Sequence, residues 1–252
     1  MPQPVSLSVN LNKIALLRNQ RDVGYPSVIQ AAETLIDAGV NGLTVHPRPD
    51  ERHIRKSDVV ELSALLAAHP GIEFNIEGFP SEDFLALACR AAPDQVTLVP
   101  DAPDQSTSDH GWLVAHHRPL LEASIAQLQA AGARVSLFMD AEPEAMAAAR
   151  AVGADRVELY TGPYAQAFGG PESGATLQRY AEAGRAAAAC GLGLNAGHDL
   201  TLDNLPAILD ALPDLQEVSI GHAFTADALW LGLEGAVQAY LGALTSRRRK
   251  CA

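Results

Sequence analysis

Short apolar runs and longer amphipathic segments alternate along the whole chain. The short runs are typical of buried strands, and the amphipathic segments carry apolar residues at the spacing of one helix face. The strands predicted in this way are Val5–Leu11, Gly42–Val45, Ile72–Ile76, Gln95–Val99, Arg134–Met139, Arg156–Tyr160, Gly193–Ala196 and Glu217–Ile220. The predicted helices are Pro26–Ala38, Ser57–Ala68, Ser81–Ala91, Pro119–Ala131, Glu142–Ala151, Gly174–Cys190, Leu205–Ala211 and Thr225–Leu244. Two long loops, Asp101–Trp112 and Thr161–Pro171, separate some of these elements.

The alternation amounts to eight strand-then-helix units with no change of composition between them. Gly39, Gly132, Gly153 and Gly191 each follow a predicted helix, where a glycine can take the left-handed conformation that ends it. Eight such units predict an α/β protein whose single domain, residues 1–252, is a (β/α)8 TIM barrel. An open, doubly wound sheet is the alternative, but it normally carries a G-x-G-x-x-G turn after its first strand, and this sequence has none.

Composition narrows the function classes further. The chain has 252 residues, 48% of them hydrophobic, which suffices for a large core, and its net charge is −12. Nucleic acid is therefore not expected as its main partner, although a local pocket can still be basic. Cys89, Cys190 and Cys251 lack the spacing of a disulfide framework or a zinc motif. We see no signal peptide and no apolar run near the roughly 18 residues of a membrane helix, so a cytoplasmic protein is expected. Residues 245–252 are expected to be a flexible basic tail.

Polar residues occupy strand positions that should face the inside of a barrel. Along residues 72–77, Ile72, Phe74 and Ile76 alternate with Glu73, Asn75 and Glu77, so the polar set is expected to point inward. Glu158 holds a similar position between two apolar residues. A buried carboxylate is costly unless it is paired, and a closed barrel has no wet edge strand that would explain it. We therefore interpret Glu73 and Glu158 as functional, and leave Glu77 open between the two interpretations.

Histidines, arginines and glycines gather where strands end. His46, Arg48 and His53 follow the second predicted strand, at the position where α/β folds bind ligands. Gly-His pairs follow strands seven and eight, which is where barrels commonly bind phosphate, because small residues let backbone N–H groups approach it. Alternatively, His46, Arg48 and His53 could be the polar residues of an ordinary solvated loop.

Three other functions remain possible from these residues. A metal-dependent hydrolase would use His46, His53, His198 and His222, but these lack short H-x-H or H-x-x-x-H spacing. A sugar-phosphate isomerase or aldolase would need a lysine at a strand end, and Lys13 and Lys56 are the only lysines before the tail. A non-enzymatic sensor of phosphorylated metabolites would not need inward carboxylates beside histidines.

Taken together, five motifs resemble the pyridoxine 5′-phosphate synthase family over nearly the whole chain. They are residues 9–21, residues 44–48 with His53, residues 98–100, residues 195–198 and residues 220–223. The resemblance implies a (β/α)8 barrel that forms a homo-octamer and needs no cofactor or metal. It implies the condensation of 1-deoxy-D-xylulose 5-phosphate with 3-amino-2-oxopropyl phosphate, which yields pyridoxine 5′-phosphate, inorganic phosphate and water.

The resemblance also implies roles for individual residues. His46 and Glu73 would accept protons, His198 would donate one, and Glu158 would stabilise the transition state. Contacts to the deoxyxylulose phosphate are implied for Arg48, His53 and Thr107, and contacts to the amino-ketone phosphate for Asn10, Arg21, Gly221 and His222. The chain departs from the family where Asn12-Lys13 replaces Asp-His and where Asp199 replaces glycine. Lys13 could still meet an anion, and Asp199 could serve through its backbone N–H.

Overall fold

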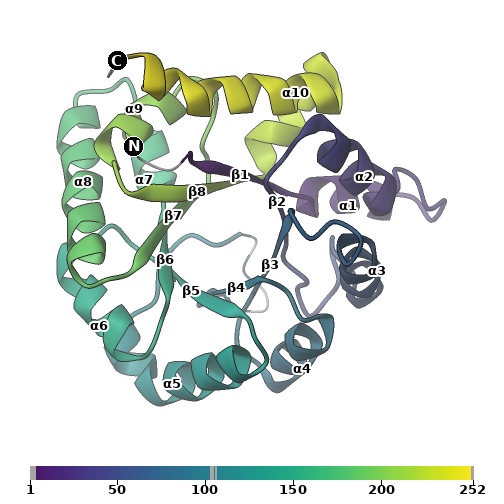
Figure 1. Cartoon of the computed structure of the whole chain (residues 1–252), viewed down its shortest axis with the longest axis horizontal. Helices are drawn as coiled ribbons and strands as arrows, with labels where there is room; N and C mark the ends of the chain where they lie inside the picture. Colours follow the sequence, from purple (N-terminus) through teal and green to yellow (C-terminus); the bar gives the residue numbers. More distant parts are fainter. Residues whose placement is uncertain (1–3, 103–104, 106, 251–252) are drawn as a thin grey trace.

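The computed structural model describes residues 4–102, 105 and 107–250, and the side chains of all of these except 246–250. Its eight parallel strands close into one barrel in sequence order, as Figure 1 shows from one end. Strand β1 pairs with β8, with Ser8 opposite Ser219, and this pairing closes the ring. The predicted (β/α)8 TIM barrel is confirmed. The strands are β1 Ser6–Asn10, β2 Gly42–Val45, β3 Glu73–Gly78, β4 Gln95–Leu98, β5 Arg134–Met139, β6 Arg156–Tyr160, β7 Gly193–Gly197 and β8 Leu215–Ile220.

Helices surround the barrel on the outside (Figure 1). They are α1 Asn12–Asn19, α2 Val28–Ala38, α3 Lys56–Leu66, α4 Glu82–Ala91, α5 Val114–Ala130, the 3₁₀ turn η1 Pro143–Ala145, α6 Met146–Ala151, α7 Gly162–Ala167, α8 Ser173–Ala189, α9 Leu205–Ala211 and α10 His222–Lys250. The glycines expected to end four helices all have positive φ, for example 97° at Gly39 and 96° at Gly132. No helix of the described chain is both long and apolar enough to cross a membrane.

Four helical predictions need correction. The loop Thr161–Pro171 contains α7, and α1 forms directly after β1, where no helix was predicted. Both helices are short, so they carry too few turns to show a clear apolar period. Helix α5 begins at Val114 and holds Pro119 inside it, whereas we expected the proline to begin the helix. Helix α10 is broken at Gly232, which has a non-helical φ of 72° that glycine adopts easily and other residues rarely do.

The inside of the barrel is polar and hydrogen-bonded. Phe74 and Ile76 of β3 are buried in the apolar core, as the alternation predicted. On the other face, the Asn75 side chain donates to Thr44 Oγ1 at 3.3 Å and accepts from Thr97 Oγ1 at 3.1 Å. Ser8 and Thr44 hydroxyls lie 2.7 Å apart. These mutual hydrogen bonds explain how a closed barrel tolerates polar residues inside.

The tail prediction stays a prediction. Helix α10 extends to Lys250, and the last two residues of the predicted basic tail lie outside the described chain.

Candidate functional site

A polar cavity of about 300 Å³ opens at the carboxyl ends of the strands, the end of a barrel at which active sites lie. Its walls come from the ends of β1, β2, β3, β6, β7 and β8 and from the loop after β4. The lining residues are Asn10, Asn12, Lys13, His46, Arg48, His53, Glu77, Thr107, Ser108, Glu158, Tyr160, His198, Asp199, Ser219, Gly221 and His222. A more apolar cavity of about 560 Å³ lies beside it and shares His46 and Arg48 in its lining.

Strand β1 leads into the cavity through two asparagines. Asn10 Oδ1 accepts the backbone N–H of Asn12 at 2.9 Å, and Asn12 Oδ1 accepts the backbone N–H of His46 at 2.9 Å. The side chain of Asn12 thus fixes the backbone of His46, although this residue departs from the family's usual aspartate. Lys13 is exposed at the first turn of α1 and lines the cavity.

Helix α1 holds the loop that carries His53. Arg18 donates to both carboxylate oxygens of Asp58 in α3, at 2.5 and 2.9 Å, and both side chains are buried. Asn19 Nδ2 donates to the backbone carbonyls of Glu51, Arg52 and His53 at 3.2, 3.1 and 2.8 Å. These bonds from α1 fix the backbone of the loop after β2.

The histidines of this loop are held neutral. The His53 Nδ1 atom accepts the backbone N–H of Ile54 at 2.9 Å, which leaves the ring proton on Nε2. Burial, followed by the charge of Arg48, lowers the pKa of His53 to about 4. Burial and the charge of Arg48 also hold the pKa of His46 well below its ordinary value of 6.5. Neutral imidazoles can accept protons at physiological pH.

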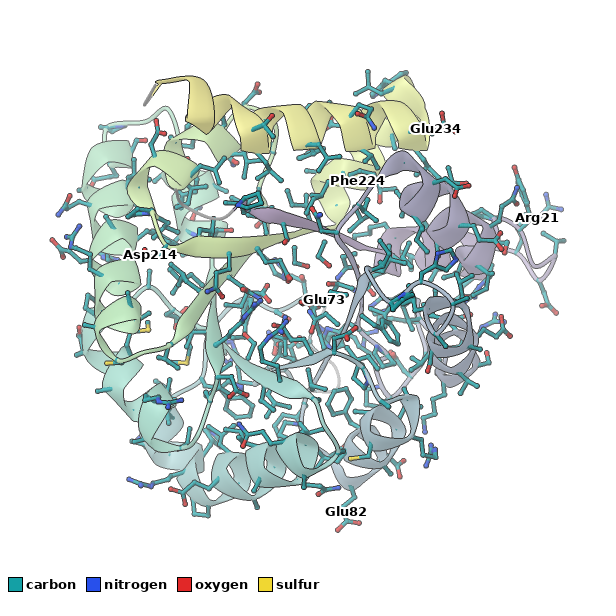
Figure 2. All side chains as sticks on the ribbon, viewed as in Figure 1. Arg21, Glu73, Glu82, Asp214, Phe224 and Glu234 are labelled. Atoms are coloured by element: carbon teal, nitrogen blue, oxygen red, sulfur yellow. The ribbon has the colours of Figure 1, made fainter. Side chains whose placement is uncertain are left out.

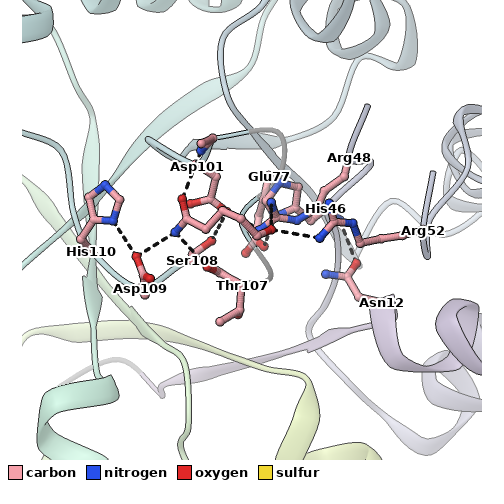
Figure 3. A network of polar contacts seen from close by, with 12 residues as sticks. Asn12, His46, Arg48, Arg52, Glu77, Asp101, Thr107, Ser108, Asp109 and His110 are labelled. Atoms are coloured by element: carbon pink, nitrogen blue, oxygen red, sulfur yellow. Dashed lines mark hydrogen bonds and ion pairs between the residues drawn. The ribbon is translucent and has the colours of Figure 1, made fainter. Parts of the chain in front are cut away.

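Arg48 and Arg52 tie the loop after β4 to the loop after β2 (Figure 3). The Arg48 guanidinium pairs with Asp101 and donates to the backbone carbonyl of Gln105 at 2.9 Å, which Arg52 also reaches at 3.0 Å. Ser108 Oγ donates to Asp101 at 2.6 Å. Thr107 lies beside these residues on the cavity wall.

Two buried carboxyl groups face the cavity. Burial, with repulsion from Asp101 and Glu217, raises the pKa of Glu77 to about 8. Burial and the neighbouring Glu77 raise the pKa of Glu158 well above its ordinary value. Glu77 Oε2 lies 3.9 Å from His46 Nδ1 and accepts a long hydrogen bond from Asn10 at 3.4 Å. A pKa of about 8 poises Glu77 to exchange protons near neutral pH.

Gly197 explains how Glu158 fits. A Cβ at this position would lie 2.2 Å from Glu158 Oε1, so only glycine lets the carboxyl group lie against β7. Glu158 Oε2 is buried without a hydrogen-bond partner among the described residues. Such an unsatisfied buried oxygen is costly, and a ligand group in the cavity could satisfy it.

The ends of β7 and β8 carry the remaining expected residues. His198 and Asp199 both have positive φ, 81° and 56°. Asp199 therefore adopts the left-handed conformation that glycine favours and that aspartate tolerates better than most residues. Gly221 packs its backbone against the side chain of Asn10, and His222 begins α10. Backbone N–H groups at a helix start attract anions.

Glu73 does not lie at this cavity. It points into the barrel as expected, and Figure 2 shows it inside the ring of strands, but it begins β3 at the opposite, amino end. Glu73 Oε2 accepts from Arg134 at 2.5 Å. Burial opposes ionisation of Glu73, yet a hydrogen bond with Glu217 and the charge of Arg134 lower its pKa. This pairing counts against the proton-accepting role expected for Glu73.

Arg21 also lies away from the cavity. It is exposed beyond the end of α1, at the rim of the molecule in Figure 2, so its phosphate contact is not made within this chain and stays a prediction.

Glu77, for which the sequence left two interpretations open, lines the cavity. Tyr160, Ser108 and Ser219 also line it, and the sequence pattern did not mark them. Strand-end positions were the available signal for Glu77 and Tyr160. Among the described residues, no three His, Cys, Asp or Glu side chains gather as they would to hold a metal ion.

The chain matches known proteins along its full barrel. The profile of the family described as "Pyridoxal phosphate biosynthesis protein PdxJ" matches residues 7–246. A pyridoxine 5′-phosphate synthase of Chelativorans sp. is 54% identical over 244 residues, which cover 95% of this chain and 98% of that protein. One of Albidiferax ferrireducens is 56% identical, covering 96% and 98%.

Solved structures resemble the chain in fold alone. Thiamine phosphate pyrophosphorylase from Pyrococcus furiosus aligns with a TM-score of 0.62 at 13% identity, over 96% of each chain. A protein of Aquifex aeolicus aligns with a TM-score of 0.64 at 14% identity, over 96% of this chain and 94% of that one.

Proposed function

Since the chain belongs to the PdxJ family of pyridoxal phosphate biosynthesis proteins, we propose that it makes pyridoxine 5′-phosphate, the product named in its relatives. The reaction is the condensation of 1-deoxy-D-xylulose 5-phosphate with 3-amino-2-oxopropyl phosphate, and it releases inorganic phosphate and water. The observation that carries this proposal is the meeting of His46, Glu77, Glu158 and His198 in one cavity beside cationic side chains.

Ring closure needs an imine and several proton transfers. Imine formation passes through a cationic nitrogen, and the two buried carboxyl groups Glu77 and Glu158 supply the matching negative charge. Burial is the largest cause that raises both pKa values, with repulsion from Asp101 and Glu217 added at Glu77 and repulsion from Glu77 added at Glu158. A cation bound between them would favour their ionised forms and turn them into bases.

We assign the carboxylate proton acceptor to Glu77 in place of Glu73. Glu77 lies 3.9 Å from His46, the second proposed acceptor, whereas Glu73 is held by Arg134 at the other end of the barrel. Glu158 keeps its proposed role in stabilising the transition state. His198 keeps its proposed role as proton donor. Burial lowers its pKa, and a bound phosphate dianion nearby would raise that pKa again and let the ring carry a proton.

Two groups of residues are proposed to bind the phosphates. Arg48, His53 and Thr107 would hold the deoxyxylulose phosphate, with Lys13 as an additional cation at the rim. Asn10, Gly221 and His222 would hold the amino-ketone phosphate at the start of α10, where backbone N–H groups favour an anion. Asn12 acts in this scheme by fixing the backbone of His46, and Asp199 by its backbone N–H.

Turnover by the purified protein tests the proposal. With both substrates present, we expect pyridoxine 5′-phosphate and inorganic phosphate to form in equal amounts, and no product with either substrate alone. The absence of product at saturating concentrations of both would reject the function.

The resemblance further suggests a cytoplasmic homo-octamer, and exposed apolar side chains support an oligomer. Val23, Tyr25 and Trp230 are 62%, 73% and 86% exposed in the single chain. Light scattering on the purified protein should give eight times the chain mass of 26.6 kDa. A monomer mass would overturn this part of the proposal.

A further inference from the structure

The turn that carries His198 has an unusual backbone. His198 and Asp199 are consecutive non-glycine residues with φ of 81° and 56°. The left-handed region costs on the order of 1–3 kcal/mol for such residues and persists only where the surroundings enforce it. Something must therefore hold the chain where it leaves β7.

Thr161 provides one part of that hold. It precedes α7 at the N-cap position, where a threonine side chain usually accepts a backbone N–H of the helix, but it makes no such bond. Its hydroxyl instead shares its proton between the backbone carbonyls of Gly197, at 2.6 Å, and His198. Its backbone N–H also donates to Gly197, at 2.9 Å, and the whole residue is buried.

Asn204 provides the other part. Its Nδ2 donates to the backbone carbonyl of Asp199 at 3.0 Å, and its Oδ1 accepts the backbone N–H of Thr201 at 2.8 Å. The second bond fixes which way the amide group points. Three consecutive carbonyls of the turn are thus held by buried side chains from two other segments.

Among the described residues, the imidazole itself is oriented by ring contacts alone. It packs edge-on against the rings of Phe138 and Tyr160, with centroid distances of 5.7 and 5.5 Å. No side chain in the described part of the protein hydrogen-bonds its nitrogens. Histidines that act in catalysis usually have one nitrogen fixed by such a bond. The direction of the ring therefore depends on the backbone of the turn.

We propose that Thr161 is a positioning residue for His198, because its diverted hydroxyl holds the left-handed turn that aims the imidazole into the cavity. Asn204 assists from the other side of the turn. The expected effect of Thr161 on turnover rests on the proposed function. Its expected effect on the orientation of the His198 ring does not.

The test compares Thr161→Val, which keeps the shape and removes the hydroxyl, with Thr161→Ser, which keeps the hydroxyl. In Thr161→Val we expect kcat to fall by about 10–100-fold, with KM for both substrates within about threefold. In Thr161→Ser, kcat should stay within about threefold of the parent. Equal kcat in the parent and Thr161→Val, or an equal loss in both variants, would overturn the proposal.

A second readout does not need turnover. The titration of His198, followed by NMR, reports its surroundings, because burial lowers its pKa, Asp199 and Asp101 raise it, and Lys13 and Arg48 lower it. In Thr161→Val the pKa should move toward 6.5 as the ring loses its fixed place, and in Thr161→Ser it should not. An unchanged titration in Thr161→Val would overturn the proposal even if the parent made no product.

Asn204→Asp keeps the test decisive if Thr161→Val does not fold. It preserves the acceptor for Thr201 and removes the donor to Asp199. We expect the same loss of kcat at constant KM, and parent-like kcat would count against a held turn.

Discussion

Replacing each of the two glutamates of β3 by glutamine should have different effects on turnover and opposite effects on stability. Glu77→Gln keeps the shape of the side chain but cannot accept a proton, so its turnover should fall by at least about 10²-fold. Glu73→Gln changes the same group on the same strand at the other end of the barrel, which makes it a matched control. We expect its turnover to stay within about threefold of the parent, because it lies away from the cavity.

The stability of Glu77→Gln follows from the raised pKa of Glu77. In the unfolded chain a glutamate ionises near 4.5, whereas in the folded protein the pKa is about 8. Between these values the folded state binds more protons than the unfolded state, so stability falls as the pH rises through this window. At pH 7, which is about 2.5 pH units above the unfolded value, the loss is about 3–4 kcal/mol. Glutamine removes this loss.

We therefore expect Glu77→Gln to melt higher than the parent at pH 7. The gain is about 2–3 kcal/mol once the long bond from Asn10 is allowed for, which corresponds to roughly 4–12 °C. The gain should shrink to about 1 kcal/mol or less at pH 5, where the folded state is protonated and the unfolded glutamate, with its pKa near 4.5, is only partly ionised. Glu73→Gln should melt lower by roughly 2–8 °C, since the partly exposed pair with Arg134 contributes about 1–2 kcal/mol.

The assay measures melting and product formation on the same preparations at pH 5, 7 and 8. The parent's kcat/KM should rise with pH up to about 8, because only ionised Glu77 accepts a proton. A Glu77→Gln variant that is as active as the parent, or a Glu73→Gln variant that loses 10²-fold without losing stability, would refute the assignment.

Three further outcomes are expected. His198→Asn should keep substrate affinity and lower turnover by roughly 10²–10⁴-fold, whereas a loss of affinity alone would make His198 a phosphate ligand. The loop 101–112 should close over bound substrate through Thr107 and be cut more slowly by protease when both phosphates are bound; equal cutting with and without ligand would argue against closure. Glu217→Gln should stabilise the protein, and more at pH 8 than at pH 5.5, because burial and repulsion from Glu73 raise the pKa of Glu217; a variant that is less stable at pH 8 would show that Glu217 is ionised and paired with Arg156.

The alternation of apolar and polar residues predicted which side chains of β3 face the barrel interior, but not at which depth. Glu73 and Glu77 share one face of the strand, and four residues of a strand separate them by about 13 Å. The alternation is identical at both positions, so it cannot show which glutamate lies at the carboxyl end of the barrel, where active sites lie, and which at the amino end. The usable signal was the distance to the end of the strand, because barrel active sites lie at the carboxyl ends.

Other features had no local signal. The helix α7 and the turn at His198 depend on each other through Thr161, whose partners Gly197 and His198 lie 36 and 37 residues away. A threonine before a glycine and a proline looks like an ordinary helix cap in sequence. Likewise, Arg21 matched a family motif. Its expected contact with a phosphate depends on neighbours of this exposed segment that a single chain does not include.

The two ends of the barrel handle their buried carboxyl groups in opposite ways. At the amino end, Arg134 pairs with Glu73 at 2.5 Å, and its charge helps to lower the pKa of that carboxyl group. At the carboxyl end, no arginine or lysine of the described chain pairs with Glu77 or Glu158, and the nearby Arg48 is taken up by Asp101. Unpaired burial lowers stability at neutral pH, so the fold gains nothing from this arrangement. A bound substrate cation would remove the penalty, which is the behaviour expected of an active site held at a cost in stability.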